Sequence, residues 1–582
     1  MTARRILRRS TVPTGSALPA SLHPVLRRVY AMRGVRGTDD LELGLERLLP
    51  VSSLGGVPAA VELLLRCHRD GRRVLVVGDF DADGATSTAL VVRQLRRLGF
   101  QDPGFLVPDR FRFGYGLTPE IVRVAATLRP DLIVTVDNGV SSVEGVAEAR
   151  RHGIDVLVTD HHLPGPALPE AAAIVNPNLH GEAFASKSLA GVGVAFYVMA
   201  ALTRALRERG VLSDSTAVNP ADLLDLVALG TVADVVPLDF NNRVLVAQGL
   251  RRIRAGRCMP GLAALLTIAG RRLETVVAQD LGFQVGPRLN AAGRLEDMTL
   301  GIDCLLTADH GEARELAGRL AALNSERREI EARMQGEALA QVDALVATLE
   351  GELPAGLCLY DDGWHQGIIG LVASRVKDRL HRPVIAFAPG DPGWIKGSAR
   401  SVPGLHVRDA LDAVAAHHPG LLEKFGGHAM AAGMTLRAER LAEFSAAFAE
   451  EVARAAGEDV LSGDLHTDGP LEPGEFNADT AAALREGGPW GAGFAEPVFD
   501  GCFGVLDTRV VGSRHLKLRL RAPSGEVADA IAFGYLDDPR AAALHAQGMV
   551  DLVYRAALDE YGGARRLQLV AEWLVPASGA GR

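Results

Sequence analysis

The sequence predicts an α/β protein: a doubly wound parallel-sheet domain, a long helical connector, a second and smaller α/β domain, and a C-terminal antiparallel β-barrel. Three observations support this prediction. Short apolar runs alternate with amphipathic stretches in the first part of the chain, as in parallel sheets with crossover helices. Residues 311–350 contain no proline and repeat apolar residues at helical spacing. From residue 461 onward, apolar and polar residues alternate between turn signals, which is typical of antiparallel strands.

The composition is that of an ordinary globular protein, with 48% hydrophobic and 23% charged residues among 582. At roughly 150 residues per domain, this length suggests three or four domains. Five scattered cysteines form no CxxC pair, which argues against a disulfide framework or structural zinc and favours a reducing compartment. The net charge of −9 does not favour nucleic-acid binding by bulk charge, but a local basic groove can coexist with an acidic exterior.

The N-terminus is basic, but no apolar signal core follows it, and no run of about 18 apolar residues occurs. We therefore expect no membrane span and a cytoplasmic protein. Residues 1–50 mix Arg and Pro with a short apolar pattern, which predicts an extended N-terminal arm that lies on the first domain.

The first strand of the predicted sheet runs into an acidic turn. An amphipathic pattern over residues 58–69 leads into the apolar residues 74–77, which Asp79, Asp81 and Asp83 follow at alternate positions. Carboxylates this close oppose each other's ionisation, and Mg²⁺ or Mn²⁺ with hard oxygen ligands would relieve the repulsion. For this pattern alone, a solvated acidic turn, a calcium loop and a chance match remain alternatives.

Two later strands end in side chains of the same kind. They are predicted at residues 132–136 and 156–158, each after a helix, near 118–128 and 141–152. Ligands of doubly wound sheets bind beyond the carboxyl ends of the strands. A helix at 85–98 would point its N-terminus at this edge and favour a phosphate there. The groups gathered at the edge would be Asp79, Asp81, Asp83, Asp137, Asp160, His161, His162 and Asp234.

Further helices complete the first domain. One is expected at residues 188–207, and another begins at Asn219-Pro220, because Pro favours the first helical position, and ends at Asp234. The Gly/Asn/Arg composition of residues 282–295 predicts a loop.

The proline-free stretch indicates one or two long helices that join two lobes; a coiled-coil partner helix is the less favoured alternative, because the heptad is not sustained. The second α/β unit begins with a strand at 357–360, includes a strand at 383–387 and closes near 421–436.

Carboxylates mixed with imidazoles suit manganese or magnesium in a two-metal site, which clamps a phosphoryl group and lowers the pKa of a bridging water. The patterns DxDxDG, VDNG and DHH, at these spacings, resemble the DHH phosphoesterase superfamily, and more closely its RecJ family of single-strand-specific 5′→3′ DNA exonucleases. Other segments similar to that family are GYGL (114–117), SLAGVGVAF (188–196), ALGTVADVVPL (228–238), GPRLNAAGRL (286–295), WHQGIIGLVASR (364–375), KGSARS (396–401), FGGHAMAAG (425–433) and GPWGAGFAEPVF (488–499).

The resemblance implies a metal-dependent exonuclease with two Mn²⁺ or Mg²⁺ ions that releases 5′-mononucleotides, in DNA recombination, repair and mismatch repair. Expected partners are single-stranded DNA, a single-strand-binding protein and a RecQ-type helicase, with a monomeric enzyme. The implied domains are an N-terminal arm (1–50), a DHH catalytic domain (51–308), a helical connector (309–350), a DHHA1 substrate-binding domain (351–455) and an OB-like nucleic-acid-binding domain (461–582).

The resemblance also implies site residues. The metal ligands would be Asp81, Asp83, Asp137, His161 and Asp234. Asp79 would be either a ligand or a base behind the ligands. His162 would lie beside the scissile phosphate, and Asp160 would orient a histidine. Asp225 competes with Asp234, which is preferred because it stands at a helix end, whereas Asp225 fits a helix start.

A larger set would contact the substrate: Arg110, Tyr115, Arg288, Asn290, Arg294, Trp364, His365, Gln366, Lys396, Ser398, Arg400, Gly426, Gly427, His428, His515 and Lys517, with Arg519 on the same strand face. The basic groups suit phosphate contacts, and Tyr115 and Trp364 suit base stacking. The alternatives are solvated surface charges, a tight glycine turn, core packing of the two aromatic rings, and a purely structural barrel face.

Selectivity for single strands would come from a channel between the lobes too narrow for a duplex. The alternative functions are a DHH hydrolase of short oligonucleotides or cyclic dinucleotides, which would not need the barrel, and a non-catalytic replication scaffold, which would have lost ligands.

Overall fold

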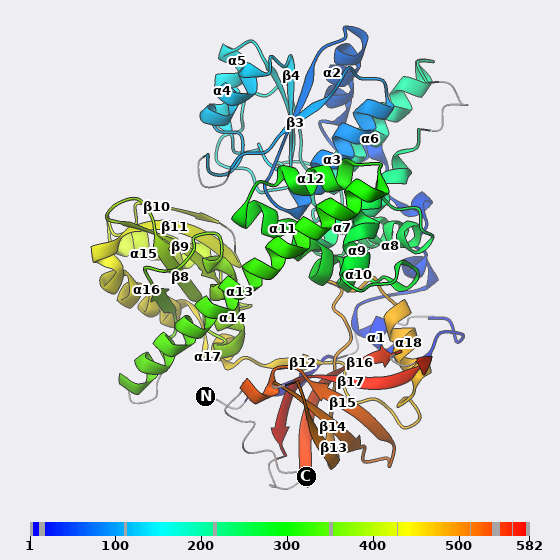
Figure 1. The fold of residues 1–582 in the computed structure, drawn as a ribbon, viewed down its shortest axis with the longest axis vertical. Coiled ribbons are helices and arrows are strands. Elements are labelled where there is room, and N and C mark those ends of the chain that lie inside the picture. Colours follow the sequence, from blue (N-terminus) through cyan, green and yellow to red (C-terminus); the bar gives the residue numbers. More distant parts are fainter. Residues whose placement is uncertain are drawn as a thin grey trace. The chain divides into compact units, whose positions relative to one another are not determined.

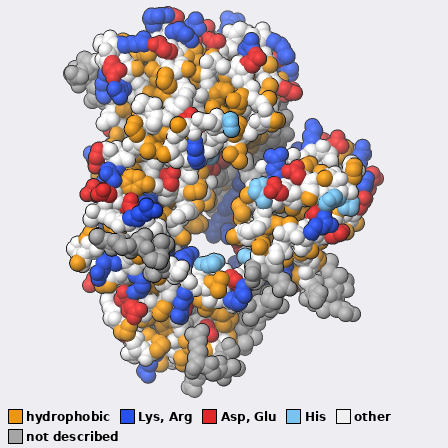
Figure 2. All heavy atoms as spheres, turned by 180° about the vertical axis from the view of Figure 1, so that it is seen from behind, with side chains coloured by type: hydrophobic (Ala, Val, Ile, Leu, Met, Phe, Trp, Pro, Cys, Tyr) orange, Lys and Arg blue, Asp and Glu red, His pale blue; other side chains and the backbone are white. Residues whose placement is uncertain are grey.

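The computed structural model describes residues 4–10, 18–109, 113–212, 218–348, 353–427, 429–512, 514–537, 548–560 and 563–577. The chain folds as two compact units. The larger unit comprises Arg8–Leu323 and Thr467–Arg582, and the smaller unit comprises Met1–Leu7 and Asn324–His466. Both are coloured by sequence in Figure 1. On the face drawn in Figure 2, acidic and basic side chains are interspersed rather than gathered by sign.

The larger unit contains the predicted parallel sheet, in the strand order β3-β2-β4-β5-β6. Its strands are β2 (Val74–Gly78), β3 (Gly104–Leu106), β4 (Leu132–Val136), β5 (Asp155–Thr159) and β6 (Ala173–Val175). The covering helices are α2 (Val57–Arg69), α3 (Ala82–Arg97), α4 (Pro119–Thr127), α5 (Val143–Arg151) and α6 (Gly191–Glu208).

Both faces of the sheet are covered, which explains its near-continuous apolar strands. Along β2, Val74 and Val76 join the core beneath α2, α3 and α6, whereas Leu75 and Val77 join the core beneath α4 and α5. Figure 1 shows these two helical layers on either side of the sheet. The doubly wound architecture is therefore confirmed.

A helical layer follows the sheet: η4 (Pro220–Leu223), α7 (Leu224–Ala233), α8 (Phe240–Arg254), α9 (Pro260–Ile268), η5 (Leu273–Thr275), α10 (Ala278–Asp280), the π-helical turn η6 (Leu281–Val285), α11 (Gly286–Leu295) and α12 (Thr299–Leu306). The predicted loop at 282–295 is wrong, because this segment is helical. Pro287 stands in the first turn of α11, where no backbone N–H is needed, and Leu289 and Ala292 face the core.

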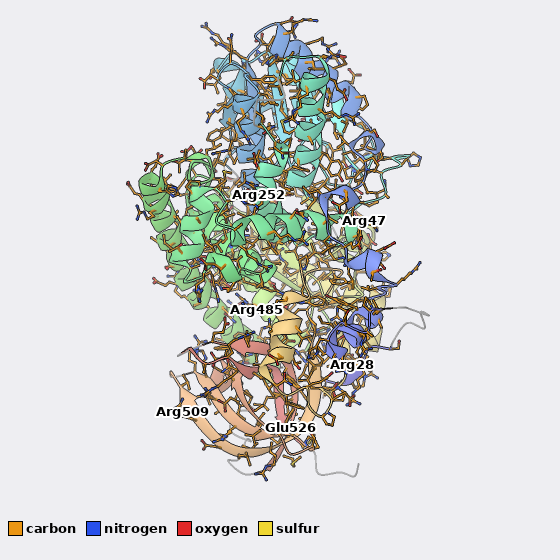
Figure 3. All side chains as sticks on the ribbon, turned by 90° about the vertical axis from the view of Figure 1, so that its right-hand side faces the viewer. Arg28, Arg47, Arg252, Arg485, Arg509 and Glu526 are labelled. Atoms are coloured by element: carbon orange, nitrogen blue, oxygen red, sulfur yellow. The ribbon has the colours of Figure 1, made fainter. Side chains whose placement is uncertain are left out.

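The N-terminal residues are not extended throughout. They form α1 (Pro24–Met32) and the short turns η1 (Thr38–Leu41), η2 (Leu45–Arg47) and η3 (Val51–Ser53). Arg28 of α1, labelled in Figure 3, pairs with Glu475 at 2.8 Å, and Arg33 pairs with Asp468 at 2.8 Å. The α1 helix therefore contacts the C-terminal segment. Further along the arm, the backbone N–H of Leu49 donates a hydrogen bond to Asn241 of α8, which belongs to the first domain.

The C-terminal part of the larger unit is a closed barrel in the order β13-β14-β15-β17-β16. Its strands are β13 (Phe499–Val511), β14 (His515–Arg521), β15 (Val527–Ala532), β16 (Gly548–Asp559) and β17 (Arg566–Pro576). The predicted barrel is confirmed, although one pair, β15 with β17, is parallel. The helix α18 (Ala478–Glu486) and the turn η8 (Tyr535–Asp537) accompany it.

The smaller unit has a five-stranded mixed sheet in the order β10-β11-β9-β8-β7. Its elements are β7 (Leu357–Tyr360), α14 (Ile369–Leu380), β8 (Val384–Pro389), β9 (Trp394–Arg400), α15 (Val407–His417), β10 (Lys424–Gly427), β11 (Ala431–Arg437), η7 (Ala438–Arg440), α16 (Leu441–Ala455) and α17 (Glu458–Ser462). Phe387, Phe444 and Phe448 anchor its core.

The proline-free stretch forms one helix, α13 (His310–Thr348). The short strands β1 (Ile6–Arg8) and β12 (Leu465–Thr467) fall where the chain passes between units. Among the described residues, no single helix meets the length and hydropathy that a membrane span requires; one bent pair, Leu45–Ser53 with Val57–Arg69, does so by length and composition.

Candidate active site

Strand ends and helix ends place the predicted acidic groups at one edge of the larger unit's sheet. Asp79 follows β2, Asp137 follows β4 and Asp160 follows β5. The paired register of β2, β4 and β5 brings these three ends level. Asp234 is the C-terminal cap of α7. The edge predicted from the sequence is therefore present as a single cluster.

Asp81 and Asp83 are fixed by the backbone around them. Asp81 caps the N-terminus of α3, and its Oδ1 accepts hydrogen bonds from the backbone N–H groups of Asp83 and Gly84, each at 3.0 Å. The two carboxylate oxygens of Asp83 accept from the N–H groups of Gly191 and Val192, at 2.6 and 3.0 Å. The first turn of α6 thus holds Asp83 from a distant part of the chain.

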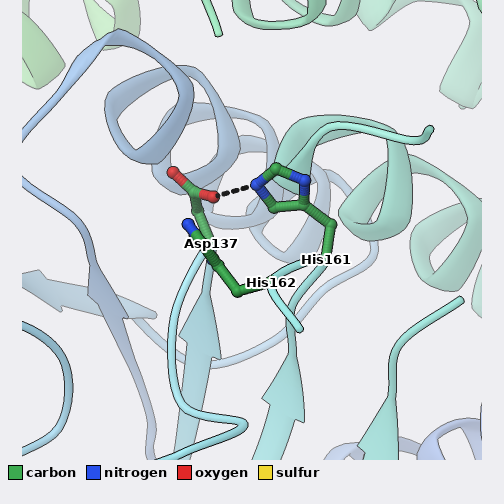
Figure 4. A group of neighbouring side chains, drawn as sticks. All are labelled: Asp137, His161 and His162. Carbon is green, nitrogen blue, oxygen red and sulfur yellow. Dashed lines mark ion pairs between the residues drawn. The ribbon is translucent and has the colours of Figure 1, made fainter. Parts of the chain in front are cut away.

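His161 lies at the centre of the cluster. Its Nε2 is 3.1 Å from Oδ1 of Asp137, 3.5 Å from Oδ2 of Asp234 and 4.0 Å from Oδ2 of Asp83. Figure 4 shows the ring of His161 directed at the carboxylate of Asp137. Asp137 itself adopts a φ of 61°, in the left-handed region that Asp tolerates better than most residues.

His162 belongs to a second pair. Its Nδ1 lies 2.7 Å from Oδ1 of the buried Asp160, and the hydroxyl of Tyr115 lies 3.2 Å from the ring nitrogens. Burial lowers the pKa of His162, but the hydrogen bond and charge of Asp160, with the charges of Asp234 and Asp79, outweigh this and raise it to about 9. Burial raises the pKa of Asp160, but the hydrogen bond and charge of His162 outweigh the effect of burial, so the pKa of Asp160 is lowered.

The electrostatics of the cluster favour a cation. Burial, and then the neighbouring carboxylates, raise the pKa of Asp83 and Asp137 well above the usual value for Asp. Burial and the charge of Asp81 raise the pKa of Asp234 to about 7. Such repulsion is what a divalent ion relieves.

The donor set fits Mn²⁺ or Mg²⁺. Three overlapping groups offer ligand atoms within 4.8 Å of one another: Asp79 with Asp81 and Asp137, Asp83 with His161 and Asp234, and Asp137 with His161 and His162. Carboxylates with imidazole suit these ions. Three glycines allow this crowding, because a Cβ at Gly191 would lie 2.7 Å from Oδ1 of Asp137, and one at Gly230 would lie 2.8 Å from Oδ1 of Asp83. The third is Gly293, whose Cβ would overlap the carbonyl oxygen of Phe80 in the acidic turn.

The comparisons with known proteins agree with this geometry. Family models match as the N-terminal domain of the DHH family over residues 73–231, the DHHA1 domain over 341–454 and the RecJ OB domain over 467–572. The chain is 51% identical to the single-stranded-DNA-specific exonuclease RecJ of Salmonella typhimurium, over 99% of this chain and 100% of that protein. The chain belongs to the RecJ family. It is also 51% identical to the RecJ of Escherichia coli, over 98% of this chain and 99% of that protein.

A solved RecJ structure shares the fold. The crystal structure of RecJ in complex with Mn²⁺ from Thermus thermophilus superposes with a TM-score of 0.78 at 32% identity, covering 96% of this chain and 76% of that chain. The structure of the same RecJ in complex with Mg²⁺ gives a TM-score of 0.72 at 30% identity, covering 96% and 75%.

Within this RecJ-family chain, the two candidates for the last acidic position separate clearly. Asp234 stands beside His161, whereas the fully buried Asp225 accepts a hydrogen bond from the N–H of Met259 at 2.7 Å. The structure brings Asp234 into the cluster and leaves Asp225 in the helical layer.

Several predicted substrate contacts have structural partners. The Oδ1 of Asn290, on α11, accepts from the N–H of Ala82 at 2.7 Å and so supports the start of α3. Trp364 is 4% exposed and donates to Glu337 at 2.9 Å, so it packs in the core of the smaller unit rather than presenting a face for stacking. Tyr115 is half exposed. Arg110 and His428 lie outside the described residues.

Other predicted contacts share surfaces within their own unit. Arg288 and Arg294 stand half-buried on α11. In the smaller unit, Lys396, Ser398 and Arg400 share one face of β9, and Gly426 and Gly427 lie on β10, joined to β9 through β11.

The remaining predicted substrate contacts lie in the smaller unit and on the outer face of the barrel. His365 accepts from the N–H of Gly367 at 3.1 Å, and Gln366 donates to the carbonyl of Pro389 at 2.6 Å. On β14, His515 and Lys517 face outward between buried leucines.

Two asparagines were not predicted. Asn176 donates to the carbonyl of His162 at 2.9 Å, and Asn178 donates to the carbonyl of His161 at 2.6 Å. They follow β6, at the same edge of the sheet, so the strand-end argument that found Asp160 would have found them if the apolar residues 173–175 had been predicted as a strand.

Proposed function

We propose that this chain hydrolyses single-stranded DNA from the 5′ end to 5′-mononucleotides, with two Mn²⁺ or Mg²⁺ ions at the cluster. The observation that carries the proposal is the convergence of carboxylates from three strand or helix ends on His161. Its class of substrate comes from the RecJ proteins, named as single-stranded-DNA-specific exonucleases, that match nearly the whole chain.

In this proposal, Asp81, Asp83, Asp137, His161 and Asp234 hold the ions, and Asp79 is a ligand or a base behind them. Asp137 and His161 each belong to two of the three groups of potential ligands. When bound, the ions supply an activated water for attack and positive charge for the departing 3′ oxygen. The protein contributes geometry, since the backbone N–H groups of α6 fix Asp83 before metal arrives.

His162 contacts the scissile phosphate. Burial lowers the pKa of His162, but the hydrogen bond to Asp160 outweighs this and raises it to about 9, which favours the protonated ring. Nδ1 lies 2.7 Å from Oδ1 of Asp160, and Nε2, which lies 3.2 Å from the Tyr115 hydroxyl, is the nitrogen that would contact a phosphate oxygen. Asp160 thus acts by orienting this ring.

The substrate path uses the basic and polar faces of each unit. Arg288 and Arg294 in the larger unit and Lys396, Ser398 and Arg400 in the smaller unit contact phosphates. His515 and Lys517 on the barrel track the strand further from the site. The DHH catalytic domain spans 51–308, the DHHA1 domain 351–455 and the OB-like domain 461–582. A single-strand-binding protein and a RecQ-type helicase are the proposed partners of a cytoplasmic monomer.

The test is digestion of 5′- and 3′-labelled single strands and blunt duplex with Mn²⁺ or Mg²⁺, by wild type, Asp137→Ala and His161→Ala. Asp155→Ala is the control, since Asp155 begins the same strand, β5, at the opposite edge of the sheet. We expect mononucleotides from the 5′ end with wild type and the control, and none with the site variants. Retained activity in both site variants would refute the metal assignment. Faster turnover of a dinucleotide than of a long strand would instead support a short-oligonucleotide hydrolase.

A further inference from the structure

Two large apolar side chains are exposed on the segments around Asp234, which belongs to the cluster. Val235 is 68% exposed and Phe283 is 72% exposed; among the described large apolar residues, none is more exposed than Phe283. Single exposed apolar residues are common. These two differ from the ordinary case in their backbone and in their position.

Val235 has a left-handed backbone, with a φ of 63°. That conformation is a genuine outlier for a β-branched residue and costs on the order of 1–3 kcal/mol. Its place, directly after the helix cap Asp234, is one where glycine is the usual choice. Because the side chain is exposed, burial does not offset the strain. The fold therefore gains nothing from valine here, which indicates a use outside the fold.

Phe283 lies on the π-helical turn η6, a rare geometry that is frequent at functional sites. This turn packs against the last turn of α7. A Cβ at Gly282 would lie 3.1 Å from Cγ1 of Val232, and one at Gly286 would lie 3.2 Å from Cβ of Ala233. Those two residues directly precede Asp234 in the chain. The turn that carries Phe283 thus packs against the helix end that delivers Asp234 to the cluster, and Val235 directly follows that end.

We propose that Val235 and Phe283 form an apolar step on which unpaired nucleobases of the substrate strand rest as the phosphate enters the cluster. This inference rests on the proposed function. Aromatic rings stack on bases without sequence preference, as a general exonuclease requires. The same helical segment carries Arg288, five residues after Phe283, so base and backbone contacts come from one rigid element.

The test compares Phe283→Ala and Val235→Gly with two controls at the opposite edge of the sheet. There the exposed Leu128 caps α4, and Arg129 also has a left-handed φ, of 53°. Leu128→Ala controls for loss of apolar surface, and Arg129→Gly controls for relief of strain. Binding is measured with a strand that carries 2-aminopurine near its 5′ end, and hydrolysis by KM and kcat.

We expect Phe283→Ala to weaken strand binding by about 5- to 150-fold, the range for one lost base stack. In Phe283→Ala, KM should rise more than kcat falls, and the melting temperature should not change. Phe283→Trp, which keeps an aromatic ring at this position, should bind the strand as wild type does. Val235→Gly should raise the melting temperature while weakening binding. Abasic residues at the 5′ end should remove the difference between wild type and Phe283→Ala. Both controls should bind as wild type does.

Three results would overturn the inference: wild-type binding by Phe283→Ala and Val235→Gly, a defect that persists on the abasic strand, or a lowered melting temperature in Phe283→Ala, which would show a structural role. Failure of the proposed function itself would look different, because the wild-type chain would not then degrade single strands.

Discussion

Replacing Gly293 with alanine tests whether α11 positions the acidic turn. A Cβ at this position would overlap the carbonyl oxygen of Phe80 outright and lie 3.1 Å from Phe80 C and from Cε of Met298. Clearing a backbone oxygen requires the helix or the turn to move by on the order of 1 Å, and a misplacement of that size can cost about 100-fold in rate. Because Phe80 lies between Asp79 and Asp81, the turn cannot move without moving both carboxylates.

We therefore expect Gly293→Ala to lower kcat by about 100-fold and to weaken Mn²⁺ binding. Overpacking should also cost about 1–3 kcal/mol of unfolding free energy. Gly318→Ala is the matched control, because Gly318 is helical, on α13, and a Cβ there meets nothing within 4 Å. The control should gain up to about 1 kcal/mol from helix propensity and keep full activity.

The assays are initial rates on a 5′-labelled single strand, calorimetric titration with Mn²⁺, and urea unfolding. Near-wild-type kcat and Mn²⁺ affinity in Gly293→Ala would refute the role given to α11. A large stability loss with unchanged affinity would show that α11 supports the core but not the site.

Three further predictions follow from the cluster. Asp234→Ala should lower the rate of Mn²⁺-dependent hydrolysis by at least ~100-fold with little loss of stability. Asp225→Ala should lower the free energy of unfolding by about 1–3 kcal/mol, because it leaves the N–H of Met259 buried and unpaired, and should retain Mn²⁺ affinity. Calorimetric titration with Mn²⁺ and urea unfolding of both variants distinguish these roles. Asp160→Ala should lower kcat about 10- to 100-fold, because His162 loses its orienting partner, and normal kcat in steady-state assays would contradict this. The pKa of Asp234 is about 7, above its value in the unfolded chain, so ionisation of this carboxyl destabilises the metal-free fold as pH rises through 7. The increase in melting temperature on adding Mn²⁺ should therefore be larger at pH 8 than at pH 6. An increase that is the same at both pH values would contradict this prediction.

The parts of the site that follow from strand order were predictable from the sequence. A run such as residues 132–136 has the length and β-branched content of a buried strand, and its bounds match β4. Parallel strands bring their carboxyl ends to one edge, so Asp137 and Asp160 could be placed together without coordinates.

The parts that depend on tertiary contact were not predictable. Residues 282–295 have the composition of a loop, because Gly, Pro and Asn favour turns. In the fold, Gly293 is required by the approach of Phe80, and Asn290 serves the start of α3, so these residues support a helix. The exposure of a side chain could not be predicted from the sequence either. Tyr115 and Trp364 both suit base stacking by residue type, but in the structure Tyr115 is exposed and Trp364 is buried.

The attachment of Asp83 to α6 has a consequence for how the protein is made. Its carboxylate is oriented by N–H groups more than 100 residues later in the chain, and the acidic turn is supported by α11, later still. During synthesis, a ribosome-bound chain that has emerged only to residue 280 presents every acidic group of the cluster and the helix α6, but not α11, which supports the acidic turn. Such nascent chains should bind Mn²⁺ weakly, so the nuclease becomes competent only after α11 has emerged and docked.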